Sequence, residues 1–137
     1  MDIIIRPAVF EDIKNIMKLH TELSSDDTPE MYESFILEFL RDGFLIVAEH
    51  ESEIIGWIIA EKSVFGIATL INWTIKPEFD NENIKHKLFS FLFEYAKSKK
   101  CISIHYYAFN EKAVDTALEN GLEIQDTNIT KLRKALV

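Results

Sequence analysis

The sequence predicts an α/β (α+β) domain in which about four helices flank a central, mixed but mostly antiparallel sheet. Runs of β-branched and aromatic residues mark the strands, and apolar residues three and four positions apart mark the helices. Three strand-like runs follow one another in the middle of the chain, separated only by short turns. A length of 137 residues, with 47% hydrophobic and 28% charged residues, fits a single domain over residues 1–137.

The first third of the chain predicts one strand and two helices. The β-branched run Ile3–Ile5 is the first strand. Glu11 and Asp12 open the first helix, because acidic residues are favoured near the positive end of a helix. The second helix begins at Pro29, and Gly43 is expected to end it as a left-handed cap.

The middle of the chain predicts a three-stranded meander over residues 44–49, 54–61 and 67–76. Gly56 lies inside the second run and indicates a bulge or the close approach of another backbone. Pro77 ends the third run, because proline has no backbone N–H to donate.

The last third predicts a long amphipathic helix, a strand, a short helix and a final strand. The long helix has the apolar positions of 84–95 on one side, and the strand covers residues 101–109. Asn110 begins the short helix, and Gly121 ends it. Residues 122–136 are expected to contain the last, more polar strand.

Charge and composition exclude several kinds of partner. A formal net charge of -8 repels phosphate backbones, so nucleic acid is not an expected partner. The single cysteine, Cys101, and four histidines without ligand spacing predict no metal site. The strongest apolar stretch, residues 54–60, is too short to span a membrane, and no signal peptide is visible. A cytoplasmic protein without a membrane partner is expected.

Short segments along almost the whole chain form an ordered series. They are Ile5–Ala8, Phe44–Glu49, Ile55–Trp57, Ile75–Phe79, Asn110–Ala113 and Asn120–Leu122. Each segment is weak alone, but their order and spacing resemble the GNAT superfamily of N-acetyltransferases. The resemblance implies the GNAT-like acyl-CoA N-acyltransferase fold and acetyl transfer from acetyl-CoA to an amine. The other interpretation is an unrelated α/β domain with the same order of elements.

The resemblance places a CoA pyrophosphate loop directly after Phe79. Family members carry Gln/Arg-x-x-Gly-x-Gly/Ala there, and the backbone N–H groups of this loop wrap the phosphates. In this chain Asp80, Asn83 and Lys85 stand at the three consensus positions. Asp80 and Glu82 add negative charge, whereas Lys85 either blocks the approach or supplies positive charge. The competing interpretation of this segment is an ordinary capped helix start.

The resemblance also implies which residues contact acetyl-CoA, the expected cosubstrate. The backbone from Trp73 to Ile75 would pair with the pantetheine, and Asn110 would contact the same arm. The full expected set is Trp73, Ile75, Asp80, Asn81, Asn83, Ile84, Lys85, His86 and Asn110.

Three residues are candidates for a catalytic role. Ala117 stands where many family members carry a tyrosine that protonates the CoA thiolate, so the usual acid is missing. Asn72 lies where members often place a carboxylate base; an amide is not a base, but it can orient a water. His105 and Tyr107 share one face of the next strand, and the ordinary pKa of histidine suits base chemistry. For His105 and Tyr107 the alternative is a packing role or an ordinary polar position on the surface.

Two functions follow from these observations. The first is an acyl-CoA-dependent N-acyltransferase acting on a small-molecule or protein amine. The second is a non-catalytic GNAT-like module that binds a partner protein or another small ligand in the same cleft. Trp57 and Trp73, on adjacent strands, either line a pocket or pack in the core. A homodimer paired through an edge strand near the C-terminus is also compatible with the sequence. Acidic residues between the first two helices either attract a cationic amine or form a solvated loop; they are Glu22, Asp26, Asp27 and Glu30.

Overall fold

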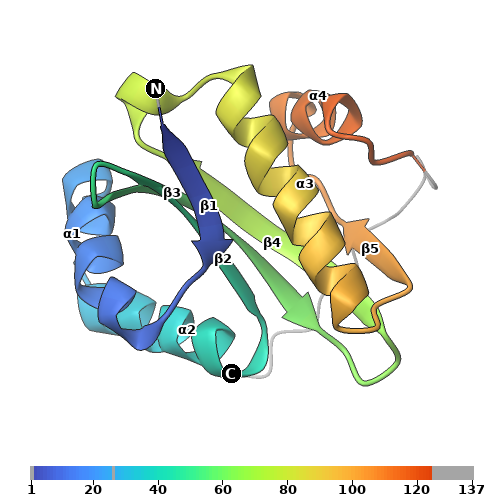
Figure 1. Cartoon of the computed structure of the whole chain (residues 1–137), viewed down its shortest axis with the longest axis horizontal. Coiled ribbons are helices and arrows are strands. Elements are labelled where there is room, and N and C mark those ends of the chain that lie inside the picture. The colour runs from blue at the N-terminus through green and yellow to red at the C-terminus, as the bar shows by residue number, and fades with distance from the viewer. Residues whose placement is uncertain (1, 26, 125–137) are drawn as a thin grey trace. The chain divides into compact units, whose positions relative to one another are not determined.

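A computed structural model describes residues 2–25 and 27–124 (Figure 1). The chain divides into two compact units, Met1–Tyr107 and Ala108–Val137. The first unit holds most of the secondary structure. Its elements are β1 (Ile3–Pro7), the one-turn 3-10 helix η1 (Phe10–Asp12), α1 (Ile13–Leu23), α2 (Pro29–Asp42), β2 (Phe44–His50), β3 (Glu53–Lys62), β4 (Ile67–Ile75), the 3-10 helix η2 (Pro77–Phe79), α3 (Glu82–Ser98) and β5 (Ser103–Tyr106).

The five strands form one sheet in the order β1-β2-β3-β4-β5. The first four strands pair antiparallel, and only β4 and β5 run parallel. A parallel pair needs a crossover, and α3 provides it between β4 and β5. The mixed, mostly antiparallel sheet with four helices in the described residues confirms the fold class expected from the sequence.

The sheet is covered on both faces. Helices α1 and α2 pack on one face, where Ile16, Ile36 and Trp57 form a buried core that water does not reach. Helix α3 covers the other face, and Figure 1 shows it lying across the sheet on the opposite side from α1 and α2. Leu88 and Leu92 of α3 are fully buried there. This two-sided packing explains why β2 and β3 are almost continuously apolar.

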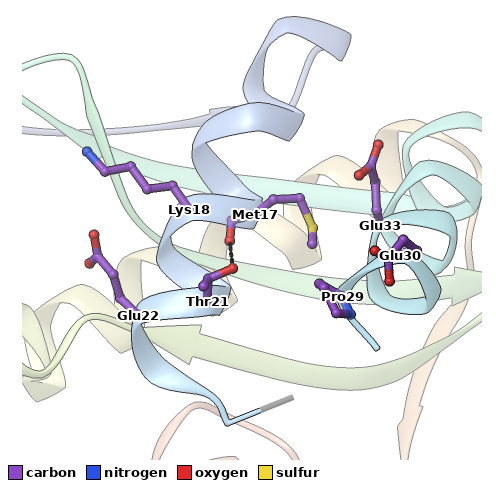
Figure 2. A pocket seen from close by; sticks show the side chains of 7 residues that line it. All are labelled: Met17, Lys18, Thr21, Glu22, Pro29, Glu30 and Glu33. Atoms are coloured by element: carbon purple, nitrogen blue, oxygen red, sulfur yellow. Dashed lines mark hydrogen bonds between the residues drawn. The ribbon is translucent and has the colours of Figure 1, made fainter. Parts of the chain in front are cut away.

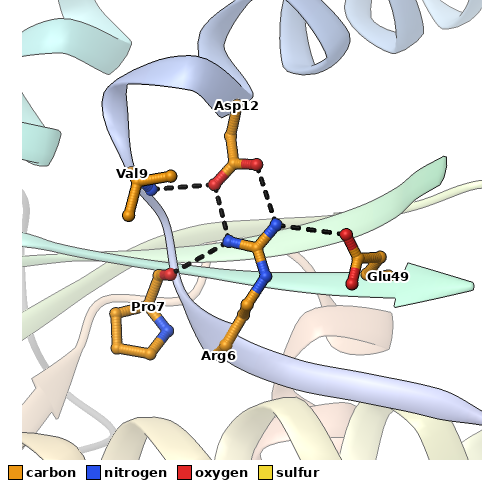
Figure 3. Close-up of polar contacts among 5 residues, drawn as sticks. All are labelled: Arg6, Pro7, Val9, Asp12 and Glu49. Carbon is orange, nitrogen blue, oxygen red and sulfur yellow. Dashed lines mark hydrogen bonds and ion pairs between the residues drawn. The ribbon is translucent and has the colours of Figure 1, made fainter. Parts of the chain in front are cut away.

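Arg6 joins the start of the chain to the sheet through a small ionic network (Figure 3). Its guanidinium makes a two-pronged contact with Asp12, at 2.7 and 2.8 Å, and donates to Glu49 at 3.2 Å. Asp12 also accepts the backbone N–H of Val9 at 2.8 Å. The Arg6 hydrogen bond lowers the pKa of Asp12, although burial opposes this. Asp12 therefore fixes the turn between β1 and α1, besides opening the helix as the sequence suggested.

Two glycines are required because another chain segment passes close by. A Cβ on Gly56 would lie 2.7 Å from the Thr74 carbonyl oxygen, and the register shift in β2–β3 falls beside it. Gly43 was expected to be a left-handed cap, and this is wrong, because its φ is -132°. A Cβ at Gly43 would instead meet the Ala60 carbonyl oxygen at 2.9 Å. The close approach, and not the backbone angle, excludes a side chain there.

The second unit contains α4 (Glu111–Glu119) within its described part. The Asn110 side chain accepts a hydrogen bond from the backbone N–H of Ala113 at 2.8 Å and so caps the helix. Gly121 follows the helix with a φ of 96°, which confirms the expected glycine stop. The last strand expected within residues 122–136 falls almost wholly outside the described residues. A single domain over residues 1–137 stays a prediction.

The strand expected over residues 101–109 is shorter in the structure. β5 covers only Ser103–Tyr106, because its ladder with β4 ends at the pair Leu70 and Tyr106. None of the helices in the described residues has the length and apolar character needed to cross a membrane.

Candidate functional site

The candidate site begins where β4 and β5 stop pairing. The last paired residues are Leu70 and Tyr106, yet β4 continues to Ile75. Beyond Leu70, β4 has a partner on its β3 side but none on its β5 side among the described strands. Backbone N–H and C=O groups without a ladder partner are available to bind an extended ligand.

An irregularity in β4 sets the direction of Asn72. Ile59 pairs with Asn72, but Ala60 pairs with Leu70, so Ile71 has no partner in the register. Such a bulge re-aims the side chains that follow it. Asn72 therefore lies on the face of the sheet that Ile59 shares with α1 and α2. Its Oδ1 is buried and accepts no hydrogen bond, which is unfavourable unless a ligand or water supplies a donor.

His105 lies on the Asn72 face of the sheet but is displaced along the strands, and Tyr107 follows the end of β5. Tyr106 packs on Trp73, which contacts α3, so its neighbour His105 on β5 points to the opposite face. His105 is opposite Thr69, and the rise of a strand places Thr69 and Asn72 on the order of 10 Å apart. His105 is exposed, and its Nε2 lies 3.3 Å from the Ser103 hydroxyl. Tyr107 is 56% exposed. The structure thus places Asn72 and His105 on one face of the sheet, and no hydrogen bond joins any two of the three candidates.

The two tryptophans lie on opposite faces and do not line one pocket. Trp57 is fully buried against α1 and α2, and its Nε1 donates to the Tyr32 hydroxyl at 3.2 Å. Trp73 pairs with Ile58, the neighbour of Trp57, and therefore points to the α3 face. There it contacts Phe89 at 5.1 Å between ring centroids. Ile75 lies two residues after Trp73 on the same strand and is half-buried.

At the expected pyrophosphate loop, Lys85 forms ion pairs with two acidic residues of the same segment. The Nζ of Lys85 lies 3.3 Å from Asp80 and 3.5 Å from Glu82, and the Lys85 side chain is only 12% exposed. Burial lowers the pKa of Lys85, but the hydrogen bond and charge of Asp80 and the charge of Glu82 outweigh it, so the pKa is raised. Lys85 is consequently charged at neutral pH, and its charge is directed at two carboxylates.

The first turn of α3 retains only part of its capacity for an anion. Asn81 is the N-cap, and its Oδ1 accepts the backbone N–H of Ile84 at 2.9 Å. The N–H groups of Glu82 and Asn83, in the first turn, have no intrahelical partner by helix geometry. Asn83 is helical and has no left-handed φ. A pyrophosphate would therefore meet two N–H donors and Lys85, but also two carboxylates. These residues therefore fit a pyrophosphate only in part, because the two carboxylates oppose it.

Each of the two remaining expected cofactor contacts has a local hydrogen-bonding partner. His86 is exposed, and its Nε2 is 3.4 Å from the Ser90 hydroxyl one turn further along α3. Asn110 belongs to the second unit, where it caps α4. In the described part of the chain, no group of three or more His, Cys, Asp or Glu side chains is arranged to hold a metal ion.

An acidic groove of about 470 Å³ lies between α1 and the start of α2 (Figure 2). Figure 2 shows Met17 pointing from α1 across the groove toward Glu30 and Glu33 of α2. Glu22, on α1, interacts electrostatically with Lys76 just after β4, so the groove and the end of β4 belong to the same end of the sheet. The sequence had indicated Glu22 and Glu30 but had missed Glu33, which the helical spacing from Glu30 signals.

Comparisons with known proteins agree with this geometry. The sequence profile of the acetyltransferase (GNAT) family matches residues 10–121, most of the chain. A comparison with curated proteins gave no significant match.

Several solved structures share the fold. The aminoglycoside N-acetyltransferase AAC(6')-Iy, solved with a CoA-containing bisubstrate analogue, superposes with a TM-score of 0.81 at 15% identity, covering 98% of this chain and 100% of that one. The PaiA N-acetyltransferase of Thermoplasma acidophilum, in complex with coenzyme A, gives 0.73 at 19% identity, with 93% and 94% covered. Glucosamine-6-phosphate N-acetyltransferase of Arabidopsis thaliana gives 0.68 at 18% identity, with 98% and 100% covered. The profile match over most of the chain, on this fold, shows that the chain belongs to the GNAT acetyltransferase family.

Proposed function

We propose that this protein is an N-acetyltransferase that transfers the acetyl group of acetyl-CoA to an amine. The observation that carries the proposal is Asn72, whose buried Oδ1 has no donor, beside the point where β4 leaves β5. Membership in the GNAT family supports it, and so do relatives solved with CoA or its analogues.

The edge of β4 beyond Leu70 would hold the acyl donor. Pantetheine carries two amide groups, which can pair with strand backbone as another strand would. The same edge would stabilise the oxyanion through a backbone N–H, because a fixed dipole is most effective where water is excluded. In this proposal Trp73 and Ile75 act through their backbone.

Asn72 would accept a hydrogen bond from the attacking amine. This contact would turn the nitrogen lone pair toward the thioester, and positioning of this kind contributes a large part of catalysis. An amide cannot remove a proton, so the amine must reach the site neutral or lose its proton through water. His105 is too far along β5 to touch an amine held by Asn72 unless water joins them.

Lys85 would bind the pyrophosphate only by leaving its two carboxylate partners. Asp80 and Glu82 hold its Nζ at 3.3 and 3.5 Å, so the phosphates must compete with them. We therefore expect CoA to bind weakly, with an affinity set by the two acids. The same ion pairs favour the second candidate function, a GNAT-like module that binds another ligand.

The first experiment is thermal unfolding of the full chain with acetyl-CoA and with free CoA. A ligand at about 100 times its Kd adds about 2.7 kcal/mol, which raises Tm by several degrees. The double variant Asp80→Asn/Glu82→Gln should bind acetyl-CoA more tightly than the wild type, because it frees Lys85 and removes two negative charges.

Glu78→Gln is the matched control, because Glu78 is an acid of the same region that pairs with Lys76 and not with Lys85. Its acetyl-CoA affinity should change little. If neither the wild type nor Asp80→Asn/Glu82→Gln shows a shift at millimolar acetyl-CoA, the transferase proposal fails and the binding module remains.

A further inference from the structure

Two turns at the end of the sheet away from the candidate site form one exposed apolar surface. The β3–β4 turn carries Val64 and Phe65, which are 93% and 81% exposed, and the α3–β5 connection carries Ile102, which is 83% exposed. The turns touch, because the backbone N–H of Ile102 donates to the Gly66 carbonyl at 2.7 Å. Figure 1 shows them side by side beyond the C-terminal end of α3. We call these three side chains the apolar tip.

Four lysines flank the apolar tip in the sequence, although the protein as a whole is acidic. Lys62 precedes the β3–β4 turn, and three lysines end α3 and begin the connection that follows it. All four belong to exposed residues; they are Lys62, Lys97, Lys99 and Lys100. The Nζ of Lys99 lies over the Tyr95 ring of α3, 5.4 Å from its centroid. The nearest acids in the sequence are Glu61 and Glu94. This end therefore has a local excess of positive charge in a chain whose net charge is -8.

Lys100 occupies a backbone position that favours glycine. Its φ is 69°, in the left-handed region, and the backbone N–H of Cys101 donates to the Ala96 carbonyl at 3.0 Å, which closes the end of α3. A lysine there is less stable than glycine, because its Cβ crowds the following carbonyl. The charge of Lys100 remains exposed two residues before Ile102.

We propose that the apolar tip and its lysines dock this protein on an anionic lipid surface. Each of the three side chains of the tip is at least four-fifths exposed, and the exposed lysines that flank them complement an anionic surface. A membrane interface accepts protruding apolar side chains, and its phosphates attract the lysines around them. This contact is peripheral and differs from membrane spanning. It is independent of the acetyl-transfer proposal. The point where β4 and β5 stop pairing lies at the other end of the sheet and would not be covered.

The test is co-sedimentation of the full chain with vesicles of phosphatidylcholine, with or without phosphatidylserine. We expect binding only to the anionic vesicles, and we expect it to weaken as salt rises. Each neutralised lysine should weaken binding about fivefold, since a lysine near an anionic surface contributes about 1 kcal/mol. Lys97→Gln/Lys100→Gln should therefore bind about 25-fold more weakly.

Matched variants separate docking from folding. Val64→Ser/Phe65→Ser should lose binding at unchanged Tm, whereas Phe65→Trp should retain it. Met31→Ser is the control, because Met31 is a 71% exposed apolar residue of α2, away from the tip. Lys100→Gly should raise Tm and lower vesicle binding, an opposite pair of effects that a purely structural lysine would not give.

Several results would overturn the proposal. These are equal binding to neutral and anionic vesicles, no binding to either, or full binding by Val64→Ser/Phe65→Ser. Binding to poly-glutamate without binding to anionic vesicles would also overturn it and would assign the surface to an acidic protein partner.

Discussion

At the scale of single residues, Asp12 shows how one carboxylate can fix a turn. It is 6% exposed and receives three hydrogen bonds, two from Arg6 and one from the Val9 backbone. Removing one member of a buried ion pair is unfavourable, because the other charge, here that of Arg6, then loses its main partner. The fold therefore depends on this side chain more than on most surface acids.

Asp12→Ala is expected to lower the free energy of unfolding by about 3 kcal/mol at neutral pH, measured by urea denaturation. Asp42→Ala is the control, because Asp42 and its partner Arg41 are both largely exposed, and it should change stability by less than about 0.5 kcal/mol.

The pH dependence of stability follows from the lowered pKa of Asp12. The native carboxylate is stabilised, so its contribution is complete above the ordinary pKa of 3.8 and is lost as the pH falls through the lower native value. Asp12→Asn should therefore lose less stability than the wild type on acidification. If the stability of Asp12→Asn falls with pH as steeply as that of the wild type, Asp12 does not control the loss of stability in acid.

Asn72 gives a test of function at a single atom. Asn72→Leu should lower turnover about 100-fold, because it removes the hydrogen bond proposed to position the amine. Its Tm should stay the same or rise, because the change removes a buried acceptor without a donor. Steady-state kinetics with an acceptor found by an amine screen, beside calorimetry, would measure both. A variant with full activity would contradict the role of Asn72.

At the scale of elements, the pairing of β3 with β4 depends on Gly56. A Cβ there would lie 2.7 Å from the Thr74 carbonyl oxygen and 3.2 Å from the Cα of Ile75, so the β4 backbone would have to move. This movement would disturb the part of β4 proposed to hold acetyl-CoA. The glycine thus connects packing in the sheet with the geometry of the site.

Gly56→Ala is expected to destabilise the protein by about 2 kcal/mol and to weaken acetyl-CoA binding. Gly121→Ala is the comparison, because nothing lies within 4 Å of its Cβ and only its positive φ opposes the change. It should be destabilised by about 1 kcal/mol through the backbone alone. Thermal unfolding of both variants with and without acetyl-CoA measures the difference. A Gly56→Ala variant that keeps wild-type stability would show that β4 adjusts without strain.

Helix α3 illustrates how one element serves two requirements. Its first turn is stabilised by the Asn81 cap and by the acid Glu82, both favoured at a helix N-terminus. The same features reduce its capacity for phosphate. A good helix start and a good anion site thus compete for the same N–H groups and the same positive end.

At the scale of the first unit, one sheet separates two apolar layers. Ile16 on the α1 side and Leu88 on the α3 side are both fully buried. The sheet lies between the two layers, and Leu88 is not part of the buried cluster that contains Ile16. Both layers are nevertheless attached to the same strands, and we expect them to unfold together.

Ile16→Ala and Leu88→Ala should each lower the free energy of unfolding by about 3 kcal/mol. The double variant should show the sum within about 0.5 kcal/mol, because the sites are distant. Denaturation followed by circular dichroism and by tryptophan fluorescence should give one common transition. Two separate transitions would show that the layers unfold independently.

The sequence by itself determined the order and kind of nearly all described elements. Hydrophobic spacing, Pro29 and Gly121 are local signals, and local signals define helices and strands wherever the buried face is continuous. The series of short segments also indicated the GNAT family, which the profile match then showed. Residue identity likewise revealed the altered loop, because a missing glycine is visible without coordinates.

Only the tertiary structure decided what depends on contacts between distant segments. The left-handed cap expected at Gly43 is wrong, because the true constraint is the Ala60 carbonyl on β3. Neither the opposite faces of Trp57 and Trp73 nor the orphan Oδ1 of Asn72 is encoded in spacing, because a bulge in β4 shifts the alternation. Hydrophobic periodicity and the preferences of turn residues act between neighbours in the chain. Burial, strand register and ion pairs such as that of Arg6 with Glu49 arise only when remote residues meet.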